Sequence, residues 1–196
     1  MIHNFRNQNN TVFSLRTLEE DDLEKAISLC NECVGENLYS EKELREAMED
    51  KNHFFYLLVT EEEEIAGYIY YYLTDLKSIS DYTKIDLVQF YDIYRDCAKA
   101  VGKIQSVGLK EEYRGSGVAV WMVRFALEEL KTQYIEIAVC VCWKMGEVVP
   151  LKNTLCECGF QFWKDAKKIW YDNTELICPY CKGRCLCDAE VHYRIL

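Results

Sequence analysis

The chain has 196 residues, of which 49% are hydrophobic and 29% charged, and its formal net charge is −10. This length suits one domain with a full core, and the composition is ordinary for a soluble globular protein. The acidic balance argues against a nucleic-acid partner, no apolar run approaches the ~20 residues of a membrane helix, and residues 1–10 lack the apolar centre of an export signal, so we expect a cytoplasmic protein without membrane contact.

The first half of the chain predicts one strand, two helices and a hairpin. Residues 1–10 are expected to be a loosely attached end. Thr17 with Glu20, and Ser40 with Glu43, are typical of capping boxes that open helices. The expected elements are a strand at 12–16, helices at 17–33 and 41–50, and paired strands at 54–60 and 65–73.

Residues 75–100 interrupt this pattern and are interpreted as a helical insertion. Apolar side chains at helical spacing predict a helix at 85–100: Leu87, Val88, Tyr91, Tyr94 and Cys97. The stretch is long for a connection between strands. A long insertion is often part of a ligand site, and simple packing explains it equally well.

The second half predicts a strand, a glycine-rich turn and a helix, followed by a buried strand. The expected elements are strands at 103–109, 134–143 and 190–196, helices at 118–130 and 147–158, and short β runs at 160–164 and 169–171. The order β-α-α-β-β-insert-β-α-β-α-β-β predicts a single α/β domain, residues 1–196, with a mixed sheet and helices on both faces.

The glycine-rich turn between the strand at 103–109 and the helix at 118–130 is the strongest functional signal. Glycines let a ligand approach the backbone, and a helix start offers unpaired N–H groups, so this arrangement suits a phosphate. The P-loop is excluded because no Lys-Ser or Lys-Thr follows Gly117. The dinucleotide fingerprint is excluded because its third glycine is Val120. A turn without a ligand remains the alternative.

The turn reads Arg114-Gly115-Ser116-Gly117-Val118-Ala119 and fits the pattern Arg/Gln-x-x-Gly-x-Gly/Ala. This pattern and the order of the elements resemble the GNAT family of N-acetyltransferases. The opening stretch 12–22 and the Cys158-Gly159-Phe160 sequence are similar to the family as well. The resemblance implies acetyl-CoA as co-substrate, with the backbone of Leu109 beside the thioester, where it would stabilise the oxyanion during direct attack by an amine. The residues implied to hold the pyrophosphate are Arg114, Gly115, Ser116, Gly117, Val118 and Ala119.

The catalytic acid and base are not identified by the resemblance. Leu155, beside Cys156, stands where many family members carry a tyrosine that protonates the thiolate, and Val148 stands where an asparagine is frequent, with Asn153 nearby. Candidate bases are Glu136, Glu147 and His192, although a structural role would explain each. We therefore expect an amine N-acetyltransferase, and keep a non-catalytic module that binds CoA or a partner as the alternative.

Eleven cysteines, an odd number without an export signal, argue against a disulfide framework. Five of them lie in apolar patterns and are expected to be small buried hydrophobic residues: Cys30, Cys33, Cys97, Cys140 and Cys142.

Four cysteines lie together in a segment at 174–189, before the last strand. Their spacing suits a closed, structural zinc site formed by Cys178, Cys181, Cys185 and Cys187. An iron–sulfur cluster or a reactive thiol cluster is the rival interpretation, and a metal- or redox-sensing protein is a third, weaker functional hypothesis. We expect this knuckle to shape the acceptor pocket or to dock a protein partner. The acceptor is a small-molecule or protein amine, and a homodimer is left open.

Overall fold

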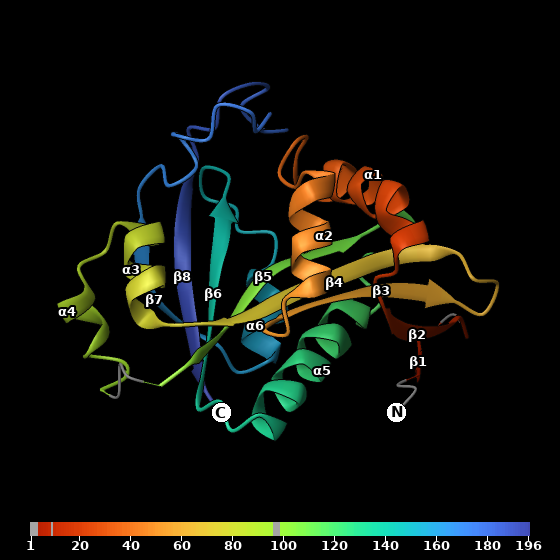
Figure 1. The fold of residues 1–196 in the computed structure, drawn as a ribbon, viewed down its shortest axis with the longest axis horizontal. Coiled ribbons are helices and arrows are strands. Elements are labelled where there is room, and N and C mark those ends of the chain that lie inside the picture. Colours follow the sequence, from red (N-terminus) through yellow and green to blue (C-terminus); the bar gives the residue numbers. More distant parts are fainter. Residues whose placement is uncertain (1–3, 9, 96–98) are drawn as a thin grey trace.

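The computed structural model describes residues 4–8, 10–95 and 99–196, which form a mixed sheet covered by helices on both faces (Figure 1). The sheet order is β1-β2-β3-β4-β5-β6-β8-β7. The strands are β1 (Asn4–Arg6), β2 (Val12–Thr17), β3 (His53–Thr60), β4 (Ile65–Thr74), β5 (Val101–Leu109), β6 (Ile137–Lys144), β7 (Gln161–Ala166) and β8 (Asp188–Ile195). This confirms the predicted fold class.

The helices follow the expected order except in the insertion, where two short helices take the place of one. They are α1 (Leu23–Val34), α2 (Glu41–Glu49), α3 (Leu76–Thr83), α4 (Leu87–Phe90), α5 (Val118–Thr132) and α6 (Lys152–Glu157), with 3₁₀ turns η1 (Glu20–Asp22) and η2 (Glu111–Tyr113). No helix in the described residues combines the length and the apolar character that a membrane span requires.

Two hydrophobic layers hold the helices against the sheet. Helices α1 and α2 bury Leu23, Leu29 and Leu44 against β3 and β4 on one face. Helix α5 buries its apolar stripe against the other face, where α6 joins it. The backbone of Gly102 lies so close to α5 that an added Cβ would stand 2.4 Å from a methyl carbon of Leu130. The central strand is therefore covered closely on the α5 face.

Local capping chemistry explains where several elements begin. Ser40 and Glu43 form the predicted capping box of α2. The predicted box at Thr17 and Glu20 is wrong, because Glu19 and Asp22 form the box instead and open η1. Asp22 accepts from the Arg16 guanidinium at 2.8 Å, and this bond holds the pKa of the Asp22 carboxyl below its usual value despite burial.

The insertion differs most from the sequence-based prediction. The helix expected at 85–100 is wrong: α3 lies earlier, where the Asp75 side chain accepts from the Ser78 amide at 2.7 Å, and α4 spans only four residues. The Asp86 side chain accepts from the Val88 amide and starts a new turn there. Cys97 lies outside the described residues. Polar caps inside an apolar pattern therefore divide the stretch into two short helices.

Smaller corrections concern the chain ends and the late elements. Residues 4–6, expected to be loose, pair with β2 as strand β1. Strand β6 begins at Ile137 rather than at 134. Helix α6 begins at Lys152 because residues 145–148 form a turn, and residues 169–171 form a turn rather than a strand.

The sheet separates into two halves at its centre. Strand β5 pairs with β4 along its length, with one bulged residue, Gln105. It pairs with the parallel strand β6 only at Gly102–Ile104. Beyond Ile104 the strands diverge, and β6 and β8 run away from β3, β4 and β5 (Figure 1). The backbone of residues 105–109 therefore borders a gap in the sheet.

Candidate active site

A cavity of about 640 Å³ occupies the gap between β5 and β6. One wall is the second half of β5, from Gln105 to Leu109, and the opposite wall is Cys140–Trp143 of β6. The turn at Arg114, Gly115 and Ala119 closes one end. The cavity therefore begins at the glycine-rich turn and follows the exposed edge of the central strand.

The glycine-rich turn leaves the start of α5 open to a ligand. Gly115 and Gly117 have φ values of 72° and 82°, which side chains rarely adopt. An added Cβ would meet nothing within 4 Å at Gly115, and only a Phe5 ring carbon at 3.9 Å at Gly117. These glycines are thus required by the backbone conformation and not by packing. Among the residues that the structure describes, the first amide of α5 with a backbone partner is that of Trp121, which donates to the Gly117 carbonyl at 3.1 Å, so the amides before it are available to an anion.

Leu109 lies at the end of β5, between the cavity and the turn. Its side chain is buried, and its carbonyl accepts from Arg114 Nε at 3.0 Å. Arg114 thereby fixes the path from the strand into the turn. Ser116 adds a second local bond, since its hydroxyl donates to the Tyr113 carbonyl at 2.6 Å.

The end of α1 and the cysteine segment close the far side of the cavity. Residues 32–34 and Leu38 line it from the α1 side, and the segment before β8 contributes Leu176, Cys178, Pro179 and Tyr180. These two flanks are joined, because the Ile177 amide donates to the Glu36 carbonyl at 3.0 Å and Asn37 Nδ2 donates to the Glu175 carbonyl at 3.2 Å. Burial raises the pKa of the Cys33 thiol at this wall.

The polar groups of the inner wall come from β5 and from the insertion. The Ser106 hydroxyl is bonded to that of Tyr39 at 2.8 Å, and burial raises the pKa of Tyr39. Gln105 lies beside Lys103, whose Nζ donates to Gln105 Oε1 at 2.7 Å. Tyr82 of α3 also lines the cavity. The insertion at 75–100 thus contributes to the cavity wall as well as to packing.

None of the three predicted base candidates, Glu136, Glu147 and His192, is among the residues that line the cavity. Glu136 precedes β6 at the end of the sheet opposite the gap, and it accepts from the Tyr94 hydroxyl at 2.6 Å and from Lys99 at 2.5 Å. These two partners lower the pKa of Glu136. Glu147 is exposed in the turn between β6 and α6. We therefore discard Glu136 as a base.

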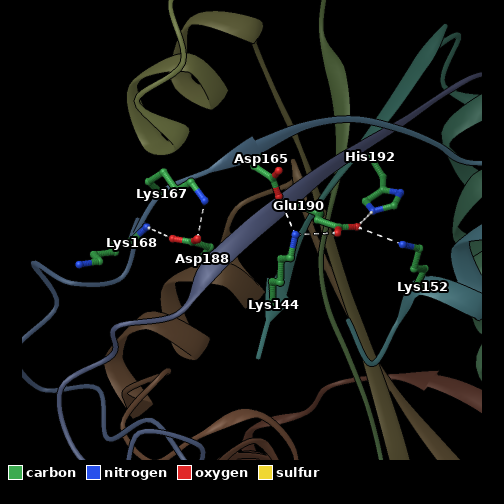
Figure 2. A network of polar contacts seen from close by, with 8 residues as sticks. All are labelled: Lys144, Lys152, Asp165, Lys167, Lys168, Asp188, Glu190 and His192. Carbon is green, nitrogen blue, oxygen red and sulfur yellow. Dashed lines mark hydrogen bonds and ion pairs between the residues drawn. The ribbon is translucent and has the colours of Figure 1, made fainter. Parts of the chain in front are cut away.

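His192 belongs to a buried polar network rather than to the cavity wall (Figure 2). It is 1% exposed, and its Nε2 lies 3.1 Å from Glu190 Oε2. Burial lowers the pKa of His192. The Glu190 carboxylate also contacts Lys144 Nζ at 3.2 Å, while Lys144 contacts Asp165 at 2.9 Å. The network joins β6, β7 and β8, which is a structural role.

The four cysteines predicted to bind metal converge on one point. The Sγ atoms of Cys178, Cys181, Cys185 and Cys187 all lie within 4.8 Å of one another. Cys181 Sγ and Cys187 Sγ are 3.6 Å apart, and Cys178 Sγ and Cys187 Sγ are 4.0 Å apart. Backbone amides donate to two of the sulfurs, from Cys181 to Cys178 Sγ and from Leu186 to Cys181 Sγ, both at 3.4 Å. The cluster borders the cavity through Cys178 and Cys185.

Several cavity residues were not predicted from the sequence. The position expected to hold a tyrosine, Leu155, is fully buried in the core, and the neighbouring Thr154 lines the cavity instead. Tyr180 and Trp170 reach the cavity from the stretch around the cysteines. Their sequence positions carry no periodic signal, because they lie in turns whose course depends on the knuckle.

Comparison with known proteins identifies the class. Residues 15–143 match the sequence profile of the Acetyltransferase (GNAT) family, so the chain belongs to this family. The fold is similar to that of Arabidopsis thaliana NAA60, solved with acetyl-CoA, with a TM-score of 0.69 and 12% identity over 94% of this chain and 98% of that chain.

Two bacterial acetyltransferases share the fold as well. A ribosomal-protein-S5-alanine acetyltransferase from Vibrio fischeri has a TM-score of 0.64 and 17% identity, covering 100% of this chain and 96% of that chain. Spermidine N-acetyltransferase SpeG from Vibrio cholerae has a TM-score of 0.60 and 15% identity, covering 93% of each chain. A comparison with curated proteins found no match.

Proposed function

We propose that the protein transfers the acetyl group of acetyl-CoA to a primary amine in the cavity between β5 and β6. The observation that carries this proposal is the continuity of the cavity with the open turn at Gly115 and Gly117. A helix start with unpaired amides suits the pyrophosphate of CoA. The edge of a strand that borders the cavity suits the extended pantetheine arm of CoA, whose amide groups can pair with the strand backbone. The family membership and the solved neighbours support acetyl transfer in general.

The thioester carbonyl of acetyl-CoA belongs nearer the start of β5 than Leu109, which is the last residue of that strand. Leu109 adjoins the turn through its bond with Arg114, so the start of the arm would lie there. Gln105, the bulged residue, is four positions earlier, which is about 13 Å at ~3.3 Å per residue. We therefore place the thioester at Gln105–Val107, where the backbone borders the gap, and propose that amides of this stretch stabilise the oxyanion.

The reaction needs a neutral amine and a proton for the leaving thiolate. The amine nitrogen attacks the thioester carbon, the C–S bond breaks from the tetrahedral intermediate, and the nitrogen loses its extra proton. With Leu155 in place of the familial tyrosine, the candidate proton donors for the sulfur are the hydroxyls that line the cavity, those of Tyr82, Ser106, Thr154 and Tyr180. The base remains unassigned, since neither Glu136 nor His192 reaches the cavity.

Calorimetry with acetyl-CoA, followed by thiol-release assays with a panel of amines, tests this function. We expect saturable binding and amine-dependent release of CoA. Absence of acetyl-CoA binding would contradict the proposal. Binding without turnover of any amine would favour the alternative, a non-catalytic module that binds CoA.

We also propose that the knuckle holds one structural zinc ion. Four ligands at 2.3 Å around a tetrahedral ion stand about 3.8 Å apart, close to the Sγ separations of 3.6 and 4.0 Å. A cubane iron–sulfur cluster binds each cysteine to a different iron and needs wider spacing. The buried Trp143 Nε1 has no acceptor among the described residues and faces Cys187, whose thiolate it would stabilise. These residues fit zinc, which would fix the cavity wall at Cys178 and Cys185.

Metal analysis of the purified protein, with about one zinc per chain expected, checks the site.

A further inference from the structure

Lys103 carries a buried ammonium group behind the cavity wall. The residue is 3% exposed, and burial lowers its pKa to about 8. Its Nζ donates to Gln105 Oε1 at 2.7 Å and to the Tyr72 hydroxyl at 2.9 Å. It also lies 4.0 Å from the centre of the Tyr82 ring. Because Gln105 and Tyr82 line the cavity, the ammonium stands directly behind its surface.

This ammonium lacks a counter-ion within the described part of the chain. No carboxylate there forms an ion pair with Lys103, and its hydrogen-bond acceptors are the neutral oxygens of Gln105 and Tyr72. The remaining partner of the ammonium is the face of the Tyr82 ring, whose centre is 4.0 Å from Nζ, and an aromatic ring carries no net charge. A buried charge without a counter-ion is costly, and an anionic ligand group at this wall would offset that cost.

The charges along the cavity agree with an anionic ligand group at this wall. Among the described lining residues, Glu32 is the one carboxylate, and it is exposed at the end of α1. A polyamine, with several ammonium groups, would meet one carboxylate and the positive charge of Lys103. The hydrogen bond between Ile177 and Glu36 joins the two flanks of the cavity, which favours a small acceptor over a folded protein.

We propose, on the basis of the acetyl-transfer function above, that the acceptor is a small primary amine that also carries a carboxylate, and that the ammonium of Lys103, behind the wall of Gln105 and Tyr82, attracts this carboxylate. The chemistry is that of a free amino acid or a close relative. The amine would reach the thioester at Gln105–Val107, while the carboxylate lies against the wall formed by Gln105 and Tyr82. Lys103 would then act as a specificity residue and would not take part in bond making.

Matched acceptors test this assignment. Thiol release is measured at saturating acetyl-CoA with amino acids, their amides and their decarboxylated amines, and with spermidine. We expect kcat/KM for the preferred amino acid to exceed that for its amide at least tenfold. Lys103→Met should lower the amino-acid value at least tenfold and change the amide value less than twofold. Lys103→Arg should keep most of the preference, and Lys77→Met, on the exposed side of α3, should change nothing.

A binding measurement separates the failure of this inference from the failure of the proposed function. Calorimetry compares the N-acetyl amino acid with the N-acetyl amine, and needs no turnover. Preferential binding of the N-acetyl amino acid, lost in Lys103→Met but not in Lys77→Met, would support the carboxylate site even without catalysis. Equal binding of both, or turnover with amides and spermidine at rates unaffected by Lys103→Met, would overturn it. Unchanged acetyl-CoA binding by the variants verifies that they are folded.

Discussion

Lys103 should leave a signature in the pH dependence of stability. Burial lowers its pKa to about 8 in the folded protein, from 10.5 for a free side chain. Below pH 8 Lys103 is protonated in both states, and the folded state bears the full cost of a buried ammonium. As the pH rises above 8, the folded state loses the Lys103 proton before the unfolded state does, and this cost disappears. The stability of the wild type relative to Lys103→Met should therefore rise between pH 8 and 10.5 by up to roughly 3 kcal/mol.

Chemical denaturation of both proteins from pH 7 to 10 measures this difference. The comparison with the variant is essential, because burial also raises the pKa of the Cys30 thiol to about 12, and this group lowers stability with rising pH in both proteins. A difference that stays flat across this range would show that Lys103 is not buried as an ammonium.

Gly117 should be necessary for the ligand and dispensable for packing. Replacement by valine places a β-branched residue at a φ of 82°, which costs about 1–2 kcal/mol of stability, and puts methyl groups where the pyrophosphate would lie. We expect Gly117→Val to weaken acetyl-CoA binding at least a hundredfold in calorimetry. Gly159→Val is the control, because Gly159 also has a positive φ, 76°, and lies in the turn after α6, outside the residues that line the cavity. Equal losses in both variants would contradict the role of the turn.

The knuckle is an element whose stability should depend on metal. Serine in place of Cys187 removes one of the four converging sulfurs. We expect Cys187→Ser to bind less than a fifth of the wild-type zinc and to show a lower Tm. The cavity should also be altered, because Cys178 and Cys185 line it.

Cys156→Ser provides the matched control for the knuckle, since Cys156 is exposed on α6 and outside the cluster. Its zinc content and Tm should equal those of the wild type. Full zinc occupancy in Cys187→Ser, or an unchanged Tm after complete chelation, would show that the four sulfurs do not form a structural site.

The network around Glu190 should stabilise the second half of the sheet without serving the ligand. Glu190 is 6% exposed and contacts Lys144 and His192 (Figure 2). Glu190→Gln removes the negative charge that Lys144 and His192 contact, although Asp165 still pairs with Lys144, and should lower the free energy of unfolding by about 2 kcal/mol. Lys152→Gln should cost under about 1 kcal/mol, because Lys152 Nζ lies 3.9 Å from Glu190 Oε2 and the Lys152 side chain is half exposed. A large loss of acetyl-CoA affinity in Glu190→Gln would indicate a direct role instead.

Elements with a strong periodic pattern were predictable from the sequence. Helix α5 and the hairpin of β3 and β4 were predicted within two residues at each end, because their apolar patterns coincide with their buried faces. The insertion was not, since Asp75 and Asp86 cap two short helices and capping outweighs periodicity over so few turns.

At the site, the parts that depend on local sequence were predictable and the parts that depend on tertiary contacts were not. Glycines fix the shape of the turn, and cysteine spacing fixes the convergence of the sulfurs. Lys103 and Tyr82 are distant in the sequence and meet only through the packing of α3. The prediction of His192 as a base failed because a lone histidine on a strand gives no indication of which neighbours cover it. The bulge at Gln105 likewise has no signal in the sequence.

At the scale of the whole molecule, the ligand should join the two halves of the sheet. The β5–β6 pairing covers only three residue pairs, and the cavity wall is drawn from both strands. Acetyl-CoA at a hundred times its dissociation constant should add about 2.7 kcal/mol to the stability of the folded state. Thermal unfolding at increasing acetyl-CoA should show a rising Tm, whereas ATP at the same concentration should have little effect. An unchanged Tm would contradict binding across the gap.

The separation of the sheet also divides the chain. Every strand before the gap, β1 to β5, precedes every strand after it, and the connection ends at Tyr134, a turn residue that is 90% exposed. Cleavage at this turn would interrupt no strand, because residue 134 lies between α5 and β6. It would leave two pieces that meet at the β5–β6 contact. Fragments 1–133 and 134–196 should therefore reassociate when co-expressed, and acetyl-CoA should favour their union, so that the enzyme could be rebuilt as a two-part reporter of the co-substrate.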